Sequence, residues 1–309
     1  MISFEEFKET VFEAVDSMVE GQVTIQQVTK NNGVVMDALL IKYKKSNISP
    51  LIYLAGYYEQ YSKGENIENI VSLIITLSKM DSGIDQDIVS NIKDLDKIRV
   101  NIQMKLINKA SNSVLLESVP YVDFLDLAII FIIDIPCCEY RNRASITITN
   151  RNLQIWGIDK DKLYDIAKEN CCGEGNYVVH NMKDIIRDLY IEITDLQEID
   201  DEDVSAMLDS ISDDKNALYV LTNQSKSNGA VTMTYENVIR DFANEKESNV
   251  YILPSSIHEV LLVAANEHMS KEQLREMVHS INSTEVDKIE ILSDNVYYYD
   301  RELDKITIA

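Results

Sequence analysis

The segment spanning residues 250–281 limits the fold more than any other stretch of this sequence. Two short runs rich in β-branched residues, Val250–Leu253 and Ile257–Val263, flank the turn residues Pro254-Ser255-Ser256. Both runs are too short for helices, and Pro and Ser favour a turn between them. The segment therefore predicts two paired strands.

A helix with a clear start follows these strands. Ser270 has Gln273 three residues later, which is the spacing of a capping box. The apolar residues that follow fall on one face of a helix, and they are Leu274, Met277, Val278 and Ile281. We expect this helix to pack against the two strands.

The same strand–strand–helix pattern recurs along the chain. The segments that show it are 34–80, 144–169, 218–244 and 250–282. The recurrence lies in the pattern and not in a sequence repeat of fixed period, so a solenoid is disfavoured. The sequence therefore predicts an α+β fold of recurring strand–strand–helix units with largely antiparallel sheets, arranged as two lobes.

Other local patterns predict individual elements. Asn31-Asn32-Gly33 predicts a hairpin, because Asn and Gly tolerate positive φ. Alternation of apolar and polar residues from Ile98 to Leu106 predicts a half-exposed strand. Further predictions are helices at 3–20, 67–80, 159–169 and 182–193, a tyrosine-rich turn at 56–61, one long buried strand at 121–135, a hairpin at 144–156, paired strands at 218–222 and 230–234, and a closing hairpin at 297–308.

An acidic run divides the predicted lobes. Residues 195–214 contain nine carboxylates and neither Lys nor Arg. Such a run cannot bury enough apolar surface to enter a core, so it indicates a solvated connector. We expect an N-terminal lobe at 1–193, the connector at 194–215 and a C-terminal lobe at 216–309.

The overall charge excludes some classes of partner. The chain has 29 Lys and Arg against 52 Asp and Glu, a net charge of −23, which disfavours nucleic-acid binding. Its most apolar run, 124–135, includes Asp126 and Asp134 and is shorter than the roughly 20 residues of a membrane span. No basic and apolar leader opens the sequence. We therefore expect a cytoplasmic protein with no membrane partner.

The four cysteines come as two adjacent pairs, Cys137-Cys138 and Cys171-Cys172. Neighbouring side chains in an extended chain point to opposite faces, so a pair does not chelate one metal readily. The sequence predicts reduced thiols, no metal site and no cofactor.

Several motifs together resemble a known family. They are Asn31-Asn32-Gly33, Tyr57-Tyr58-Glu59-Gln60-Tyr61, Val119-Pro120-Tyr121, Phe124-Leu125-Asp126-Leu127-Ala128, Tyr219-Val220-Leu221-Thr222-Asn223, and Leu253-Pro254-Ser255-Ser256-Ile257-His258-Glu259. The chain resembles an uncharacterised bacterial family of this length from anaerobic Gram-positive gut bacteria, with a Leu-Pro-Ser-Ser-x-His-Glu signature. The resemblance implies a bacterial cytoplasm, and it supplies no catalytic residues because the family has no assigned activity.

The best candidates for a catalytic site surround the turn before the second strand. They are Ser255, Ser256, His258 and Glu259. Consecutive side chains on a strand face opposite sides, so His258 and Glu259 cannot form a dyad there. No Gly-x-Ser-x-Gly elbow is present in the sequence. We favour a hydrogen-bonded structural histidine over a catalytic one.

Tyrosine is unusually frequent, with sixteen Tyr against six Phe and one Trp. Because Tyr combines apolar area with a hydroxyl, it is enriched at recognition surfaces. The candidate binding residues are Tyr57, Tyr58, Tyr61, Tyr297, Tyr298 and Tyr299. Packing at the edge of the core explains the same residues equally well.

These patterns lead to one functional prediction and two alternatives. The leading prediction is a non-enzymatic intracellular binding or adaptor protein with a protein partner, because the sequence contains no complete catalytic constellation. The first alternative is a hydrolase-like enzyme with a dispersed site around Ser255, Ser256 and His258. The second is an acidic decoy for nucleic-acid-binding proteins.

Overall fold

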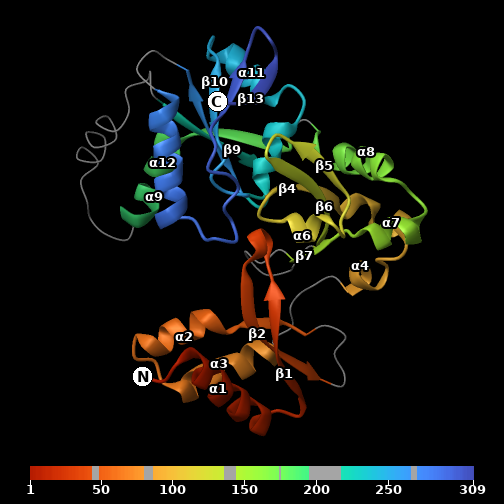
Figure 1. The fold of residues 1–309 in the computed structure, drawn as a ribbon, viewed down its shortest axis with the longest axis vertical. Coiled ribbons are helices and arrows are strands. Elements are labelled where there is room, and N and C mark those ends of the chain that lie inside the picture. Colours follow the sequence, from red (N-terminus) through yellow and green to blue (C-terminus); the bar gives the residue numbers. More distant parts are fainter. Residues whose placement is uncertain (44–48, 80–85, 136–143, 174, 195–216, 266–269) are drawn as a thin grey trace. The chain divides into compact units, whose positions relative to one another are not determined.

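The computed structural model of the chain forms two compact units. It describes residues 1–43, 49–79, 86–135, 144–173, 175–194, 217–265 and 270–309. The N-terminal unit contains the described residues of Met1–Gln86 together with Ala144, and the C-terminal unit contains those of Asp87–Ile135 and Ser145–Ala309 (Figure 1). The N-terminal unit has one sheet and the C-terminal unit has two, and each unit has its own hydrophobic core.

Among its described residues, the N-terminal unit combines an antiparallel sheet of order β1-β2-β3 with three α-helices and a 3₁₀ turn, η1 (Asn31–Gly33). Phe7, Leu39 and Ile74 come from two helices and one strand and are fully buried in one core. At its edge, Lys8 Nζ lies 2.8 Å from Asp37 Oδ2. The elements are α1 (Phe4–Met18), β1 (Gly21–Thr29), β2 (Val35–Tyr43), β3 (Leu51–Tyr53), α2 (Leu54–Ser62) and α3 (Ile67–Lys79).

The C-terminal unit contains a four-stranded sheet, in which β6 pairs with β4, β5 and β7. All nine residues of β6 are buried, which explains its nearly continuous apolar sequence. The elements of this part are α4 (Gln86–Ser90), α5 (Leu95–Ile98), β4 (Ile102–Asn108), α6 (Ser113–Leu116), β5 (Tyr121–Phe124), β6 (Leu127–Ile135), β7 (Ala144–Thr147), α7 (Asn150–Trp156) and α8 (Lys160–Cys171).

The same unit contains a six-stranded sheet of order β13-β12-β10-β11-β9-β8, in which all five pairings are antiparallel. Its elements are β8 (Tyr177–Asn181), α9 (Met182–Thr194), β9 (Leu218–Asn223), a 3₁₀ helix η4 (Gly229–Thr234), α11 (Val238–Glu245), β10 (Val250–Leu253), β11 (Val260–Ala264), α12 (Lys271–Thr284), β12 (Tyr297–Asp300) and β13 (Lys305–Ile308). The predicted α+β class with largely antiparallel sheets is confirmed.

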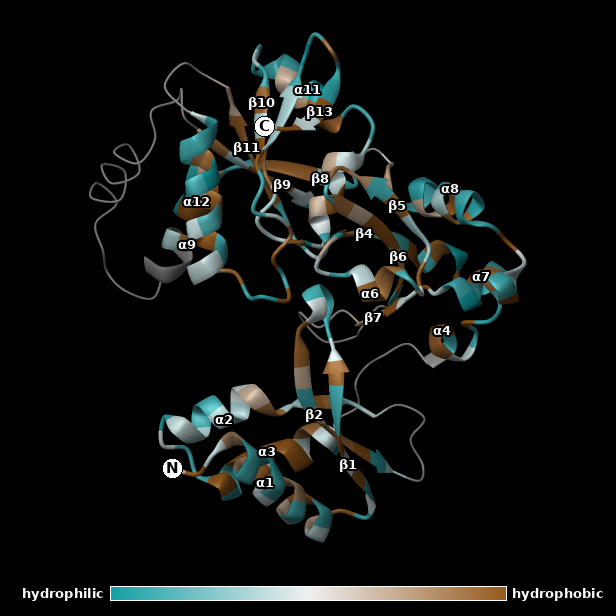
Figure 2. Cartoon of the chain, in the orientation of Figure 1, coloured by the Kyte–Doolittle hydropathy of each residue, from teal (hydrophilic) through white to brown (hydrophobic). Residues whose placement is uncertain are grey.

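The segment at 250–281 forms the predicted elements. β10 and β11 pair antiparallel, from Val250↔Ala264 to Leu253↔Leu261. Ser270 and Gln273 make the predicted capping box of α12. Hydrophobic and hydrophilic residues alternate around this helix in Figure 2, and its Leu274 and Val278 are buried.

Three predicted strand or turn segments are helical instead. The predicted tyrosine-rich turn at 56–61 lies within α2, and the rings of Tyr58 and Tyr61 pack against Phe4 and Phe7 of α1. Residues 150–156 form α7 and not half of a hairpin, because Thr149 and Asn152 make a capping box that the sequence analysis missed. Residues 229–234 form η4 and not a strand. A Cβ on Gly229 would lie 2.1 Å from Thr222 Oγ1, so only glycine fits this close approach.

The predicted buried strand at 121–135 is a hairpin. β5 pairs antiparallel with β6, from Phe124↔Leu127 to Tyr121↔Ile130. Leu125 opens the turn with φ 54°, a conformation that is rare for leucine and carries no sequence signal. The predicted strand at 98–106 also starts late: Ile98 ends α5, Val100 is 76% exposed, and β4 begins at Ile102.

The compact units divide the chain at other positions than the predicted lobes. β8, which precedes the acidic connector, pairs with β9, which follows it, from Tyr177↔Asn223 to Asn181↔Tyr219. Elements on both sides of the connector therefore share one sheet. The boundary between the two compact units lies near residue 86 instead. The connector itself, apart from Thr194, lies outside the described residues. Within the described parts of the chain, none of the helices combines the length and apolar character that crossing a membrane requires.

Replacing Leu274 by Ala should lower the free energy of unfolding by about 2–5 kcal/mol, because this 2%-exposed side chain would leave a cavity beneath α12. Urea denaturation followed by circular dichroism measures the change. Glu276→Ala, on the exposed face of the same helix, is the control and should change stability by no more than about 0.5 kcal/mol. Equal effects of the two substitutions would contradict the packing of α12.

Candidate binding site

The candidate catalytic residues lie in the loop between β10 and β11 and not on a strand. Ser256 is buried and forms an isolated bridge with Ile291. The Ser255 carbonyl accepts the Leu292 N–H at 3.0 Å. Backbone pairing with residues 290–293 therefore fixes this loop.

The side-chain contacts of His258 fix its position. Its Nδ1 accepts the Asn228 N–H at 3.2 Å, so a neutral imidazole carries its proton on Nε2. That Nε2 lies 3.3 Å from Glu290 Oε1. Its own backbone N–H donates to Ser256 Oγ at 3.0 Å. Both imidazole nitrogens thus contact groups other than a serine hydroxyl.

The Ser256 hydroxyl, which accepts the His258 backbone N–H, also makes a hydrogen bond with the Glu259 side chain. Burial raises the pKa of Glu259, Glu290 raises it further, and His258 and the hydrogen bond with Ser256 oppose the shift. The structure therefore brings Ser256, His258 and Glu259 together. It does not place the imidazole of His258 against the Ser256 oxygen, as a serine nucleophile and its base require.

The first group of candidate binding tyrosines lies on α2 in the N-terminal unit. The Tyr58 ring centroid lies 5.1 Å from that of Phe4, and the Tyr61 centroid lies 5.5 Å from that of Phe7. The Tyr58 hydroxyl donates to the Ile2 carbonyl at 3.0 Å. Tyr57 is half-buried, and burial raises its pKa. These residues pack at the edge of a core.

The second group lies on β12 in the C-terminal unit. Tyr297 and Tyr299 are buried. Tyr298 is half-buried on the other face, and its ring centroid lies 5.1 Å from that of Tyr251. Its hydroxyl accepts the Asn249 amide N–H at 2.7 Å. Tyr298 therefore connects the predicted binding residues to a surface hollow that contains Asn249.

This hollow, which we call the α11–β12 hollow, has a volume of about 710 Å³. It lies between the turn from α11 to β10 and the turn from β12 to β13. The two turns meet because β10 pairs with β12, with Val250 opposite Tyr299. Its lining is polar and consists of Asn244, Glu247, Ser248, Asn249, Asp300, Arg301 and Glu302.

Arg301 is held in the hollow by two amide side chains. Its guanidinium Nη2 and Nε lie 3.3 Å and 3.4 Å from Asn244 Oδ1. Its backbone N–H donates to Asn249 Oδ1 at 3.0 Å. Among the described residues, no carboxylate oxygen lies within 4.0 Å of the Arg301 guanidinium nitrogens, the distance that defines an ion pair. The positive charge of Arg301 is therefore oriented but not neutralised by a direct contact.

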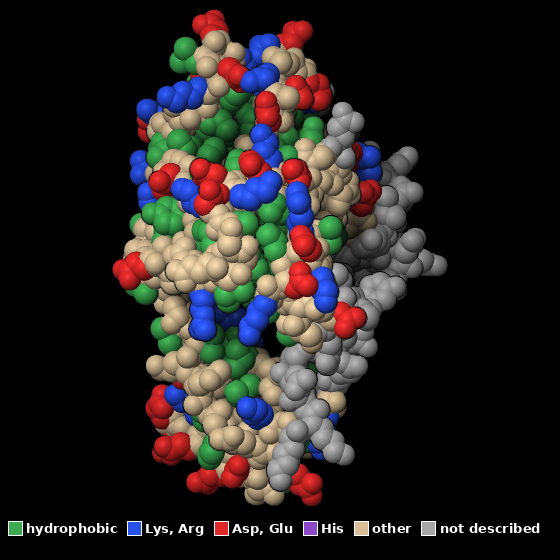
Figure 3. Space-filling model, turned by 90° about the vertical axis from the view of Figure 1, so that its right-hand side faces the viewer, with side chains coloured by type: hydrophobic (Ala, Val, Ile, Leu, Met, Phe, Trp, Pro, Cys, Tyr) green, Lys and Arg blue, Asp and Glu red, His purple; other side chains and the backbone are tan. Residues whose placement is uncertain are grey.

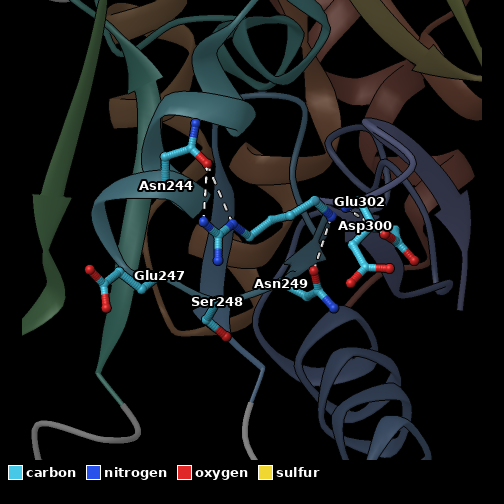
Figure 4. A pocket seen from close by; sticks show the side chains of 7 residues that line it. Asn244, Glu247, Ser248, Asn249, Asp300 and Glu302 are labelled. Atoms are coloured by element: carbon cyan, nitrogen blue, oxygen red, sulfur yellow. Dashed lines mark hydrogen bonds between the residues drawn. The ribbon is translucent and has the colours of Figure 1, made fainter.

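Carboxylates stand at two ends of the hollow. In Figure 4, Glu247 lies on one side and Asp300 and Glu302 on the other, with Ser248 and Asn249 between them. Asp300 Oδ1 already accepts the backbone N–H groups of Glu302 and Leu303, at 2.9 Å and 3.1 Å. Asp300 therefore shapes the turn.

Glu247 has an unfavourable backbone conformation. It follows the C-cap of α11 with φ 52°, at a position where glycine is the preferred residue. The Ser248 N–H still donates to the Ala243 carbonyl at 3.1 Å, which closes the helix end. A glutamate here keeps a carboxylate in the hollow despite a backbone penalty of about 1 kcal/mol.

Apart from the tyrosine cluster that includes Tyr298, no local sequence pattern points to this site. Asn244 and Arg301 are separated by more than fifty positions, and no motif connects them. Only the pairing of β10 with β12 brings their turns together. The one local signal was the cluster Tyr297–Tyr299, which directly precedes the turn.

No metal or redox site emerges from the described residues. Among them, no group of three or more His, Cys, Asp or Glu side chains is placed to hold a metal ion. Cys171 is buried, and burial raises the pKa of Cys172 to about 11, so both are protonated at neutral pH. Cys137 and Cys138 lie outside the described residues.

If His258 is structural, His258→Ala should lower the free energy of unfolding by about 1–3 kcal/mol, because the Asn228 N–H loses its acceptor and Glu290 loses its partner. Thermal and urea denaturation measure the loss. His279→Ala is the control, since that side chain is 73% exposed on α12. A fully stable His258→Ala variant would contradict a structural histidine.

Comparison with known proteins identifies the family but not an activity. No curated protein and no solved structure matches the chain. The family model for DUF5688, described as a family of unknown function, matches residues 4–301, which takes in most of both compact units. The predicted resemblance to a family without an assigned function is confirmed, whereas the bacterial origin and the 253–259 signature remain predictions. The chain belongs to the DUF5688 family.

Proposed function

We propose that this protein is a non-enzymatic binding protein, and that its α11–β12 hollow binds a short peptide carrying both an ammonium and a carboxylate group. The observation that carries the proposal is the state of Arg301: an arginine oriented by two asparagines and lacking a carboxylate partner among the described residues. The hollow, of about 710 Å³, lies in the range of known ligand sites.

Arg301 supports recognition of a carboxylate. Its guanidinium has five N–H donors, and the contacts to Asn244 engage only Nε and Nη2. The remaining N–H groups can donate to a carboxylate in the forked geometry that arginine provides. Because the side chain is already oriented, less conformational entropy is lost when the ligand binds.

Glu247 and Glu302 support recognition of an ammonium group. Both are exposed carboxylates at the rim, and they lie on different sides of the hollow in Figure 4. The lining holds three carboxylates and one guanidinium, so a ligand with an anionic group alone should bind more weakly than one that also carries an ammonium group. A ligand with both charges matches this distribution, and the Asn and Ser side chains can bond peptide groups.

Tyr298, one of the predicted binding residues, positions the Asn249 side chain. The Tyr298 hydroxyl accepts from Asn249 Nδ2, which turns Asn249 Oδ1 toward the Arg301 N–H. A tilted contact with the Tyr251 ring, at a centroid distance of 5.1 Å, holds the Tyr298 ring. Tyr298 therefore acts on the ligand through Asn249 and Arg301.

The two alternative functions have less support. The hydrolase-like reading needs contact between the Ser256 hydroxyl and the His258 imidazole, but both nitrogens of that imidazole have other partners. The decoy reading needs an extended acidic face. On the face drawn in Figure 3, Lys and Arg side chains lie among the Asp and Glu side chains.

Three forms of one peptide test the proposal by isothermal titration calorimetry at low salt. Triglycine carries both charges, N-acetyltriglycine only the carboxylate, and triglycinamide only the ammonium. Arg301→Gln should weaken binding of the two carboxylate forms by about two- to tenfold and leave triglycinamide unchanged. Glu247→Gln should weaken the two ammonium forms and leave N-acetyltriglycine unchanged.

Arg275→Gln is the matched control, because Arg275 is exposed on α12 and does not line the hollow. It should change none of the three affinities. Equal losses for all three peptides in Arg301→Gln, or no heat from triglycine at millimolar concentrations, would overturn the proposed function.

Glu247→Gly should separate stability from binding. Glycine adopts φ 52° without a Cβ penalty, so the free energy of unfolding should rise by about 0.5–1 kcal/mol. Triglycine affinity should fall at the same time, which is the trade-off expected when strain is retained for function. Denaturation and calorimetry on one preparation measure both, and a stabilised variant with unchanged affinity would exclude Glu247 from the site.

A further inference from the structure

A second cavity lies beside the same β12–β13 turn. Its wall is apolar, whereas the lining of the α11–β12 hollow is polar. It has a volume of about 270 Å³ and lies between β5, η4, α11 and the β12–β13 hairpin. We call it the Phe124 pocket. Its apolar wall comes from four separate elements and consists of Phe124, Met233, Ile239 and Ile306.

The polar rim of the Phe124 pocket is organised around Arg240. The guanidinium makes two contacts with the Asp304 carboxylate, with Nε 2.9 Å from Oδ1, and Nη1 donates to Asn237 Oδ1 at 2.6 Å. The Tyr299 hydroxyl donates to Asp304 Oδ1 at 2.6 Å. Four side chains from α11, the residue before it and the β12–β13 hairpin therefore form one fixed network.

Two members of this network have left-handed backbone conformations. Asn237 has φ 70° and Asp304 has φ 48°. Asparagine and aspartate tolerate this region better than most residues, but it still costs them more than glycine. The fold thus keeps two strained positions that fix Arg240 at the rim of an apolar pocket.

The rim has a net positive charge. Arg240 and Lys305 contribute two positive charges, and Asp304 contributes one negative charge. Arg240 is paired with Asp304, whereas Lys305 is exposed and, among the described residues, lies within 4.0 Å of no carboxylate. In a chain of net charge −23, this is a local site for a single anionic group.

We propose that the Phe124 pocket binds a small carboxylic acid with an aromatic or branched aliphatic body. The body packs against Phe124, Met233 and Ile306, and the carboxylate lies at the rim near Lys305. The cavity volume of about 270 Å³ leaves room for a single ring with a short acid chain. A dicarboxylate is a poorer fit, because its second negative charge would lie against the Asp304 carboxylate or the apolar wall.

This site is independent of the α11–β12 hollow. The hollow takes Asp300, Arg301 and Glu302 from the β12–β13 connection, whereas the pocket takes Asp304, Lys305 and Ile306. The two sites share no lining residue. The proposed acid should therefore bind whether or not triglycine does.

The test compares 3-phenylpropanoate with its neutral analogue 3-phenylpropanamide in a double-mutant cycle on the full chain. Wild type should bind the acid about two- to fivefold more tightly than the amide, the size expected for a partly exposed charge contact. Lys305→Gln should bring the acid down to the affinity of the amide. The methyl NMR signals of Met233, Ile239 and Ile306 should shift with either ligand.

Two further variants keep the test interpretable. Ile306→Ala should weaken both ligands equally, since it removes part of the apolar wall, and its thermal denaturation shows whether it is folded. Lys160→Gln, at an exposed position outside the pocket, should change neither affinity. Equal binding of acid and amide to wild type, an unchanged acid affinity in Lys305→Gln, or shifts confined to other methyl groups would overturn the proposal.

Discussion

The carboxylate of Asp126 joins the two sheets of the C-terminal unit. It lies in the turn between β5 and β6 and accepts hydrogen bonds from Tyr297 Oη at 2.5 Å, Ser293 Oγ at 2.7 Å and Asn295 Nδ2 at 3.0 Å. Tyr297 is fully buried at the start of β12, so its hydroxyl needs this acceptor. Burial and the contact with Asp126 both raise the pKa of Tyr297, which therefore stays a donor.

This network also explains the strained turn that contains it. Leu125 keeps φ 54° in a two-residue hairpin turn without glycine. Three hydrogen bonds to the next residue, together with the Lys109 N–H bond to the Asp126 carbonyl at 3.1 Å, compensate for that strain. Removing the carboxylate would leave buried donors without an acceptor. It would also remove the hydrogen bonds that compensate for the strained backbone of the turn.

Both proposed sites depend on the strand that Asp126 anchors. Side chains alternate along β12, so Tyr298 faces one side and Tyr299 the other. Tyr298 orients Asn249 in the α11–β12 hollow, and Tyr299 contacts Asp304 at the rim of the Phe124 pocket. α11 also contributes to both sites, because Asn244 lines the hollow and Arg240, one turn earlier, lines the pocket.

The sequence predicted elements whose signals are local and missed those that tertiary contacts impose. Ser270 with Gln273 and Asn31-Asn32-Gly33 carry their geometry within a few residues, and both the capping box and the hairpin between β1 and β2 are confirmed. The turn at Leu125 has no such signal, because Asp126 is held by residues more than 160 positions away. The two sites were missed for the same reason, since they gather turn residues whose proximity depends on strand pairing.

The distribution of positive backbone φ angles is consistent with both proposals. Among the residues that the structure describes, seven other than glycine have positive φ, and three of them line the proposed sites: Glu247 in the hollow, and Asn237 and Asp304 in the pocket. Asn32 and Asp304 lie in hairpin turns, where such a conformation is ordinary for asparagine and aspartate. Glutamate lacks that tolerance, so the backbone of Glu247 is the less expected of these conformations. Glycine would relieve the strain at Glu247 but would remove its carboxylate, and at Asn237 or Asp304 it would remove a contact to Arg240. Stability has therefore been given up where α11 meets the β12–β13 turn, which is the expected location if these side chains act on ligands.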